Sequence, residues 1–88
     1  MVSKKVQVIN KQGFHMRPAN DFVREMAKFK SDIHLIMDEK DVNGKSIMNI
    51  MAACIKCGSE IEVRCEGEDE QAMLDKAVEL IESGLGEA

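Results

Sequence analysis

Residues 13–29 read GFHMRPANDFVREMAKF, and this stretch sets the pattern from which the fold is predicted. After Gly13 the apolar residues recur at spacings of three and four, the period of an amphipathic helix. They are Ala19, Phe22, Val23, Met26 and Phe29. Pro18 suits the first turn of such a helix, where a backbone N–H would lack a partner. The stretch therefore predicts a helix over residues 17–29, with a histidine two residues before it.

Four strands and two further helices are predicted around this helix. The strands are expected where apolar and polar residues alternate, and the helices where the spacing returns to three and four. Strands are expected at residues 2–10, 32–38, 40–42 and 60–66, and helices at 47–54 and 68–83. Each strand shows one apolar face. The order βαββαβα therefore indicates an α+β fold, in which an antiparallel sheet carries its helices on a single side.

The ends of the two later helices also have sequence signals. Ser46 is a suitable N-cap for the shorter helix, which Gly58 is expected to end. Acidic residues in the first turn of the longer helix match the helix dipole, and Gly84 is its expected stop. The stripe facing the core is expected to hold Met73, Ala77, Leu80 and Ile81, flanked by Leu74 and Val78.

Composition excludes several classes of protein. No apolar run approaches the roughly 20 residues of a membrane span, so no membrane insertion is expected. The first ten residues alternate too soon for a signal peptide, which predicts a cytoplasmic protein. The chain has no Trp or Tyr and only three Phe, so a stacking platform for nucleic acid is not expected.

Charge is distributed unevenly along the 88 residues. Residues 1–30 carry seven Lys or Arg against two acids, whereas residues 31–88 carry five against fourteen. The region around the histidine is therefore basic within an acidic protein. This favours an anionic ligand or an acidic partner surface over direct binding of nucleic acid.

His15 lies where the free N–H groups and the positive end of a helix dipole converge. That field disfavours the imidazolium, keeps a ring nitrogen available as a nucleophile, and stabilises a dianion attached to it. Arg17 offers a forked donor to phosphate oxygens. Spacing alone leaves open that His15 is an ordinary polar residue at a helix start and Arg17 a solvated charge.

A family resemblance favours a role of His15 as a nucleophile that accepts a phosphoryl group. Three segments resemble HPr, the histidine-containing phosphocarrier family of the bacterial phosphoenolpyruvate-dependent sugar phosphotransferase system. They are GFHMRPA, KSIMNIMAACIKCG from Lys45, and KFKSDIHL between the two. The resemblance runs the full length of the chain, as a single HPr-like domain over residues 1–88. It implies an open-faced β-sandwich whose four antiparallel strands have the order 1-4-2-3, with three helices on one face.

The resemblance also implies a function. His15 would accept a phosphoryl group on Nδ1 from phosphorylated enzyme I and donate it to the IIA domains of sugar permeases, while Arg17 steadies the group. Such a protein is a carrier and not a turnover enzyme, needs no metal or cofactor, and is expected to be a monomer. Met16 and Phe14 depart from the commonest motif, which has alanine and a smaller aliphatic residue there.

Ser46 has two compatible readings. As an N-cap its hydroxyl would accept a backbone N–H bond, and nothing more is needed. The surrounding KSIMNIM resembles the site modified by the ATP-dependent HPr kinase/phosphorylase. A phosphate there adds about −1.5 to −2 charges. This change would weaken binding to acidic enzyme I and favour a basic transcription factor, which the resemblance identifies as the catabolite control protein.

The helix after Ser46 is almost entirely apolar, so part of it must remain exposed. Ile47, Met48 and Met51 match the surface that docks partners in the family. Flexible thioethers suit a surface that meets several unlike partners. Phe14 and Met16 are expected to extend this surface.

The three cysteines have no assigned role. Cys54 and Cys57 form C-x-x-C, but they close a helix, whereas a redox pair normally opens one. Cys65 alternates in phase with Ile61 and Val63 and is therefore expected in the core. His34 is expected on the opposite strand face, so neither a zinc site nor a redox pair is expected.

Three rival functions stay open. A regulatory binding module acting through Ser46 alone is disfavoured because His15 and Arg17 are both kept. A carrier for nitrogen-related phosphorelays would generally lack the Ser46 segment. A small phosphatase would need a second acid–base group or a metal ligand beside His15, and no nearby motif supplies one.

Overall fold

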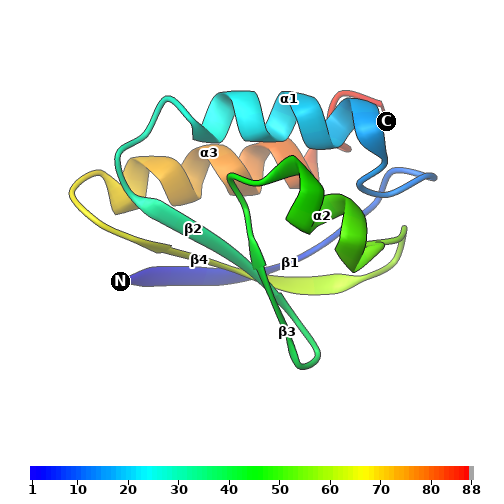
Figure 1. The fold of residues 1–88 in the computed structure, drawn as a ribbon, viewed down its shortest axis with the longest axis horizontal. Coiled ribbons are helices and arrows are strands. Elements are labelled where there is room, and N and C mark those ends of the chain that lie inside the picture. The colour runs from blue at the N-terminus through cyan, green and yellow to red at the C-terminus, as the bar shows by residue number, and fades with distance from the viewer. Residues whose placement is uncertain (88) are drawn as a thin grey trace.

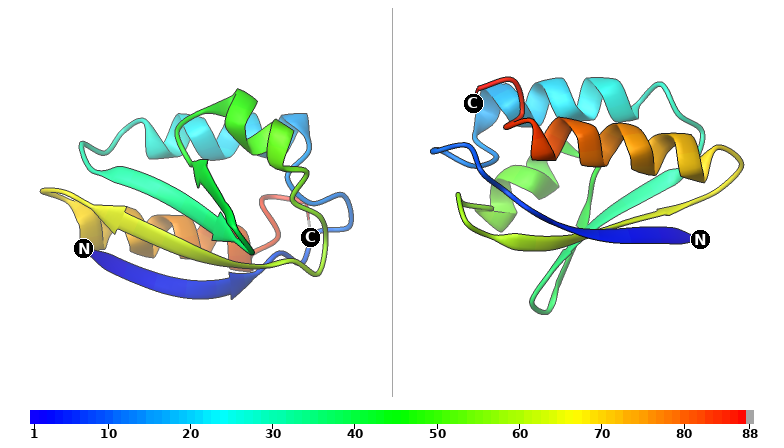
Figure 2. Two further views of the ribbon diagram at one scale, coloured as in Figure 1. Left: turned by 60° about the horizontal axis from the view of Figure 1, so that its bottom comes forward. Right: turned by 180° about the vertical axis from the view of Figure 1, so that it is seen from behind.

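The strands of the computed structural model, which describes residues 1–87, form one four-stranded antiparallel sheet in the order β1-β4-β2-β3. The elements are β1 (Val2–Gln7), α1 (Met16–Met26), β2 (Asp32–Met37), β3 (Lys40–Asn43), α2 (Ile47–Ala53), β4 (Glu60–Glu66) and α3 (Glu70–Glu82). The helices cover one side of the sheet, and the other side is uncovered (Figure 1, Figure 2). The predicted α+β class, element order and strand order are confirmed.

The alternation along the strands builds the core. Direct cross-strand partners on the helix side include Val6 with Ile61 and Leu35 with both Val63 and Val42. All five are at most 4% exposed. Because successive side chains of a strand point to opposite faces, the intervening polar residues lie on the uncovered side.

The helices complete the core, with one correction to the expected stripe of α3. The buried residues of α3 are Met73, Leu74, Ala77, Val78 and Ile81, whereas Leu80 is only partly buried. The sequence prediction placed Leu80 inward and Val78 on the flank. α3 contacts both β1 and β4, so its stripe is turned toward the edge strand and Leu80 lies at the margin.

All three helices end earlier than predicted, α3 by one residue at Glu82. α1 ends at Met26. After it, the backbone N–H groups of Lys28 and Phe29 donate to the carbonyls three residues earlier, at 3.2 and 3.1 Å. α2 ends at Ala53, because Cys54 adopts a left-handed conformation with φ 51°. This turn lets Ile55 enter the core, where it is 2% exposed. Gly58 therefore lies in the following turn and does not end the helix.

The predicted burial of Cys65 is confirmed. Cys65 is fully buried in β4, while Cys54 and Cys57 are exposed. Burial raises the pKa of the Cys65 thiol to about 11. Among residues 1–87 no cluster of three or more His, Cys, Asp or Glu is placed to hold a metal ion. In that same part of the chain, every helix is too short or too polar to cross a membrane.

Candidate functional site around His15

His15 is the residue that immediately precedes α1. Its backbone is extended, with φ −79° and ψ −176°, and its carbonyl accepts the Ala19 N–H at 3.0 Å. The ring does not cap the helix. The amides of Met16 and Arg17 lie in the first turn, where an α-helix offers no carbonyl partner. The predicted position of the histidine at the positive end of a helix dipole is therefore confirmed.

The loop on the N-terminal side of His15 packs closely against Ile55. Gly13 has φ 62°, and a Cβ there would collide with the carbonyl oxygen of Ile55. The next residue, Phe14, donates its N–H to that same oxygen at 3.0 Å. Glycine is thus required both by the left-handed conformation and by the close approach of the two segments.

Phe14 corrects a sequence expectation. The residue was expected to extend the partner surface, but it is only 3% exposed. Its ring packs edge-to-face on Phe22, with the centroids 5.3 Å apart. Packing on α1 draws this ring inward, so Phe14 belongs to the core and anchors the loop beneath His15.

The imidazole has a partner that the sequence analysis missed. His15 Nε2 lies 2.7 Å from Glu87 Oε2. The chain reaches this position because Gly84, Leu85 and Gly86 all have positive φ, at 86°, 55° and 80°. Leu85 is 6% exposed and packs in the core, which holds the C-terminal tail after α3 in place. The signal that was available is the GLGE segment, in which two glycines flank an apolar residue just before the acid.

Asn10, also missed, holds the same carboxylate. Its Nδ2 donates to Glu87 Oε1 at 2.9 Å and to the Gly13 carbonyl at 2.7 Å. The hydrogen bond from Asn10 is the main cause that lowers the pKa of Glu87. His15 and the charge of Arg17 lower it further, while partial burial acts in the opposite direction. Glu87 is therefore a carboxylate at neutral pH.

The ring of His15 is left with one nitrogen for chemistry. Its side chain is 33% exposed, and the hydrogen bond that it makes within residues 1–87 uses Nε2. Nδ1 is consequently the nitrogen available to a reagent from solution. A neutral imidazole that donates through one nitrogen carries a lone pair on the other.

Arg17 supplies positive charge beside this pair. Its side chain is exposed in the first turn of α1, and its charge lowers the pKa of Glu87. The guanidinium makes none of the ion pairs found within residues 1–87. It is therefore available to a ligand that carries negative charge.

Ser46 caps α2, as predicted. Its Oγ accepts the backbone N–H of Asn49 at 3.2 Å and the side-chain amide of Asn49 at 3.0 Å. The serine is partly exposed, so its hydroxyl lies at the surface. α2 packs on α1, which carries His15 at its start.

Two of the remaining predicted surface residues are strongly exposed. Met16 is 62% exposed and Met48 is 81% exposed. Ile47 and Met51 are partly buried, while Ile50 and Ala53 turn inward to the core. We refer to Met16, Ile47, Met48 and Met51 as the methionine patch.

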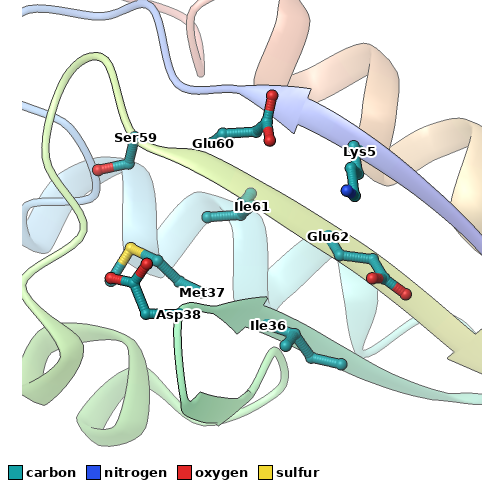
Figure 3. A pocket seen from close by; sticks show the side chains of 8 residues that line it. All are labelled: Lys5, Ile36, Met37, Asp38, Ser59, Glu60, Ile61 and Glu62. Atoms are coloured by element: carbon teal, nitrogen blue, oxygen red, sulfur yellow. The ribbon is translucent and has the colours of Figure 1, made fainter.

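A separate hollow lies in the sheet, away from His15. It measures about 430 Å³ and opens beyond Ile36 and Glu62, where the pairing of β2 with β4 ends. Figure 3 shows Met37 and Asp38 on one side of it and Ser59 and Ile61 on the other. His15 and Arg17 do not line this hollow.

Fold and site together define a class of small α+β proteins that carry a partly exposed histidine at the start of a helix. The family model described as the PTS HPr component phosphorylation site matches residues 2–83. The chain belongs to the HPr family, the phosphocarriers of the phosphotransferase system.

Individual relatives agree with this assignment. The chain is 44% identical over 87 residues to the phosphocarrier protein HPr of Treponema pallidum, covering 99% of each chain. It is 46% identical over 76 residues to the HPr-like protein Crh of Bacillus subtilis, covering 86% of this chain and 89% of Crh.

Solved structures agree as well. The crystal structure of HPr-C-His from Thermoanaerobacter tengcongensis matches with a TM-score of 0.95 and 41% identity, covering 100% of this chain and 99% of the other. A structure described as an HPr dimer from the same organism matches with a TM-score of 0.78 and 41% identity, covering 99% and 100%. These relatives connect the family with phosphotransferase-dependent sugar transport and catabolite repression.

Proposed function

We propose that His15 accepts a phosphoryl group on Nδ1 from phosphorylated enzyme I and donates it to the IIA domains of sugar permeases. The observation that carries this proposal is the contact of Nε2 with Glu87, which leaves Nδ1 free at the start of α1. Nucleophilic attack needs a lone pair, and the nitrogen opposite the donating one provides it.

Charge around His15 supports the acceptance of a phosphoryl group. The first-turn amides of α1 and the positive end of its dipole favour a dianion attached to the ring. Arg17 adds a guanidinium able to bind two phosphate oxygens at once. Because the ring is half-buried and not enclosed, two proteins can meet at it directly.

We propose that the methionine patch is the docking surface for enzyme I, for the IIA domains and for the regulatory partners. An exposed apolar surface of flexible side chains can fit several unlike proteins. Ser46 would be phosphorylated by the HPr kinase/phosphorylase. The added negative charge would weaken docking of acidic enzyme I and favour the catabolite control protein.

The remaining parts of the proposal concern the state of the protein. We expect residues 1–88 to act as one HPr-like domain that is cytoplasmic and monomeric and needs no cofactor or metal. We expect neither direct nucleic-acid binding nor membrane insertion. The dimeric relative makes the oligomeric state a point to measure, by light scattering at several concentrations.

Intact mass spectrometry tests the central proposal. The chain is incubated with phosphoenolpyruvate and an enzyme I that phosphorylates a control carrier. One added phosphoryl group, lost in mild acid and absent in His15→Ala, is the expected result. An unchanged mass would refute transfer to His15.

A regulatory role without phosphotransfer is the second candidate, because the relative Crh is 46% identical to this chain. That role would work through Ser46 alone. It predicts phosphorylation of Ser46 by the kinase with ATP and no acid-labile phosphate on His15. In the carrier role, Ser46→Asp should slow phosphorylation of His15 by enzyme I, while His15→Ala should leave the Ser46 reaction intact.

A further inference from the structure

Asn10 is a buried polar side chain in the loop before His15. It is 2% exposed, and its Nδ2 donates to the Gly13 carbonyl at 2.7 Å and to Glu87 Oε1 at 2.9 Å. Both partners are oxygens that can only accept, which fixes the orientation of the amide. The second bond joins residues 77 positions apart in the sequence.

The other end of this amide makes no compensating contact. Asn10 Oδ1 is buried and has no hydrogen-bond partner within residues 1–87. A buried acceptor without a donor is unfavourable, and an apolar side chain here would avoid that cost. The favourable contribution of Asn10 is therefore made by its nitrogen, which ties the Gly13 loop to Glu87.

Glu87 uses its two oxygens for two different partners. Oε1 accepts from Asn10, and Oε2 lies 2.7 Å from His15 Nε2. The tail is fixed from the other side by Leu85, which is 6% exposed and donates its N–H to the Leu80 carbonyl at 2.8 Å. The carboxylate is thus positioned by a buried amide and a buried side chain together.

We propose that Asn10 is a positioning residue that holds the Glu87 carboxylate against His15 Nε2. The ring then carries its proton on Nε2 and presents the lone pair of Nδ1 to the phosphoryl donor. This inference rests on the proposed role of His15 as the phosphoryl acceptor. Asn10 contacts neither the ring nor the phosphoryl group, and it acts through Glu87.

The charge balance of the transfer explains why this contact matters. The Nδ1 lone pair forms the new N–P bond, while the bond from phosphorus to the donor atom of phosphorylated enzyme I breaks and returns its electron pair to that atom. The Nε2 proton stays in place, so the ring of His15 becomes cationic. A carboxylate already at hydrogen-bond distance attracts that charge more strongly than it attracts the neutral ring.

The first test needs no partner protein. In ¹⁵N-labelled, unphosphorylated chain at a pH where the ring is neutral, NMR should find the His15 proton on Nε2 and slow to exchange with water. Asn10→Ala and Glu87→Ala should each add an Nδ1–H population and speed that exchange. Glu82→Ala removes an exposed acid of α3 and should leave the signals of His15 unchanged.

The second test is a double-mutant cycle on the single-turnover rate of His15 phosphorylation by phosphorylated enzyme I. Asn10→Ala and Glu87→Ala should each lower the rate about tenfold, equivalent to about 1.4 kcal/mol. The double variant should be no slower than Glu87→Ala alone, because Asn10 acts through Glu87. Asn10→Asp keeps the volume but loses the donor, and it should be as slow as Asn10→Ala.

The outcomes separate this inference from the proposed function. Rate losses that multiply in the double variant, or a wild-type tautomer in Asn10→Ala, would overturn the role of Asn10. Circular dichroism of each variant excludes loss of the fold as the cause. If enzyme I leaves the wild-type chain unphosphorylated, the proposed function fails, while the NMR result still decides whether Asn10 sets the tautomer.

Discussion

Replacing Phe14 by alanine should destabilise the protein strongly, because this side chain belongs to the core and not to the docking surface. The ring is 3% exposed and packs edge-to-face on Phe22 at 5.3 Å. Removing a buried Phe typically costs about 3–5 kcal/mol, and aromatic pairs of this geometry contribute about 0.5–1.5 kcal/mol beyond their burial. We expect a loss of about 4 kcal/mol, a large share of the roughly 4–13 kcal/mol typical for 88 residues.

Urea unfolding followed by far-UV circular dichroism measures this loss, since the chain has no Trp or Tyr to report by fluorescence. The matched control is Met48→Ala, which truncates an apolar side chain that is 81% exposed. Its free energy of unfolding should stay within about 0.5 kcal/mol of wild type. If Phe14→Ala loses less than about 1 kcal/mol and behaves like Met48→Ala, the placement of Phe14 in the core is refuted.

Three further predictions follow from local contacts. Gly13→Ala should lower the unfolding free energy by more than about 2 kcal/mol, because backbone strain at φ 62° adds to the collision with Ile55. Gly58 has φ 90° but open space around it, so Gly58→Ala should lose less, and calorimetry compares the two variants. Ser46→Ala should lose about 1 kcal/mol of cap energy in urea titrations, while Ser46→Asp keeps the cap and should lose less than half of that. Hydrogen bonds from the Ser31 side chain and from the Lys30 and Ser31 amides lower the pKa of Asp69 to about 2. The stabilising contribution of Asp69 is therefore present above about pH 4 and lost as the pH falls toward 2. Asp69→Asn should make the unfolding free energy depend less on pH over that range in acid titrations, and an unchanged slope would contradict this assignment.

The layers of the fold were predictable because each element has a clear period. Alternation placed Ile61, Val63 and Cys65 on one face of β4, and the structure buries all three. Helix ends were harder to predict. The turn at Cys54 depends on the need to bury Ile55, which is a tertiary effect that no local signal reports.

The site was predictable only in part. A histidine before a helix and an arginine two residues on are local features, and the structure places both at the start of α1. The contacts of Glu87 with Asn10 and His15 span 77 and 72 positions. They exist only because the tail after α3 passes beside the start of α1 (Figure 1), so no periodicity could reveal them. Phe14 was misplaced because its burial is decided by Phe22, and not by its neighbours in sequence.

The distribution of the three thiols gives the protein an internal reporter of sheet opening. Cys54 and Cys57 are exposed and should react with a thiol reagent at once. Cys65 lies within β4, between β1 and β2, and while the sheet is closed its burial and its pKa of about 11 leave little reactive thiolate. Modification should therefore occur in two phases, with the slow one following the opening of the central strand. The third thiol thus makes it possible to follow the stability of the carrier without denaturant, while its partners are bound.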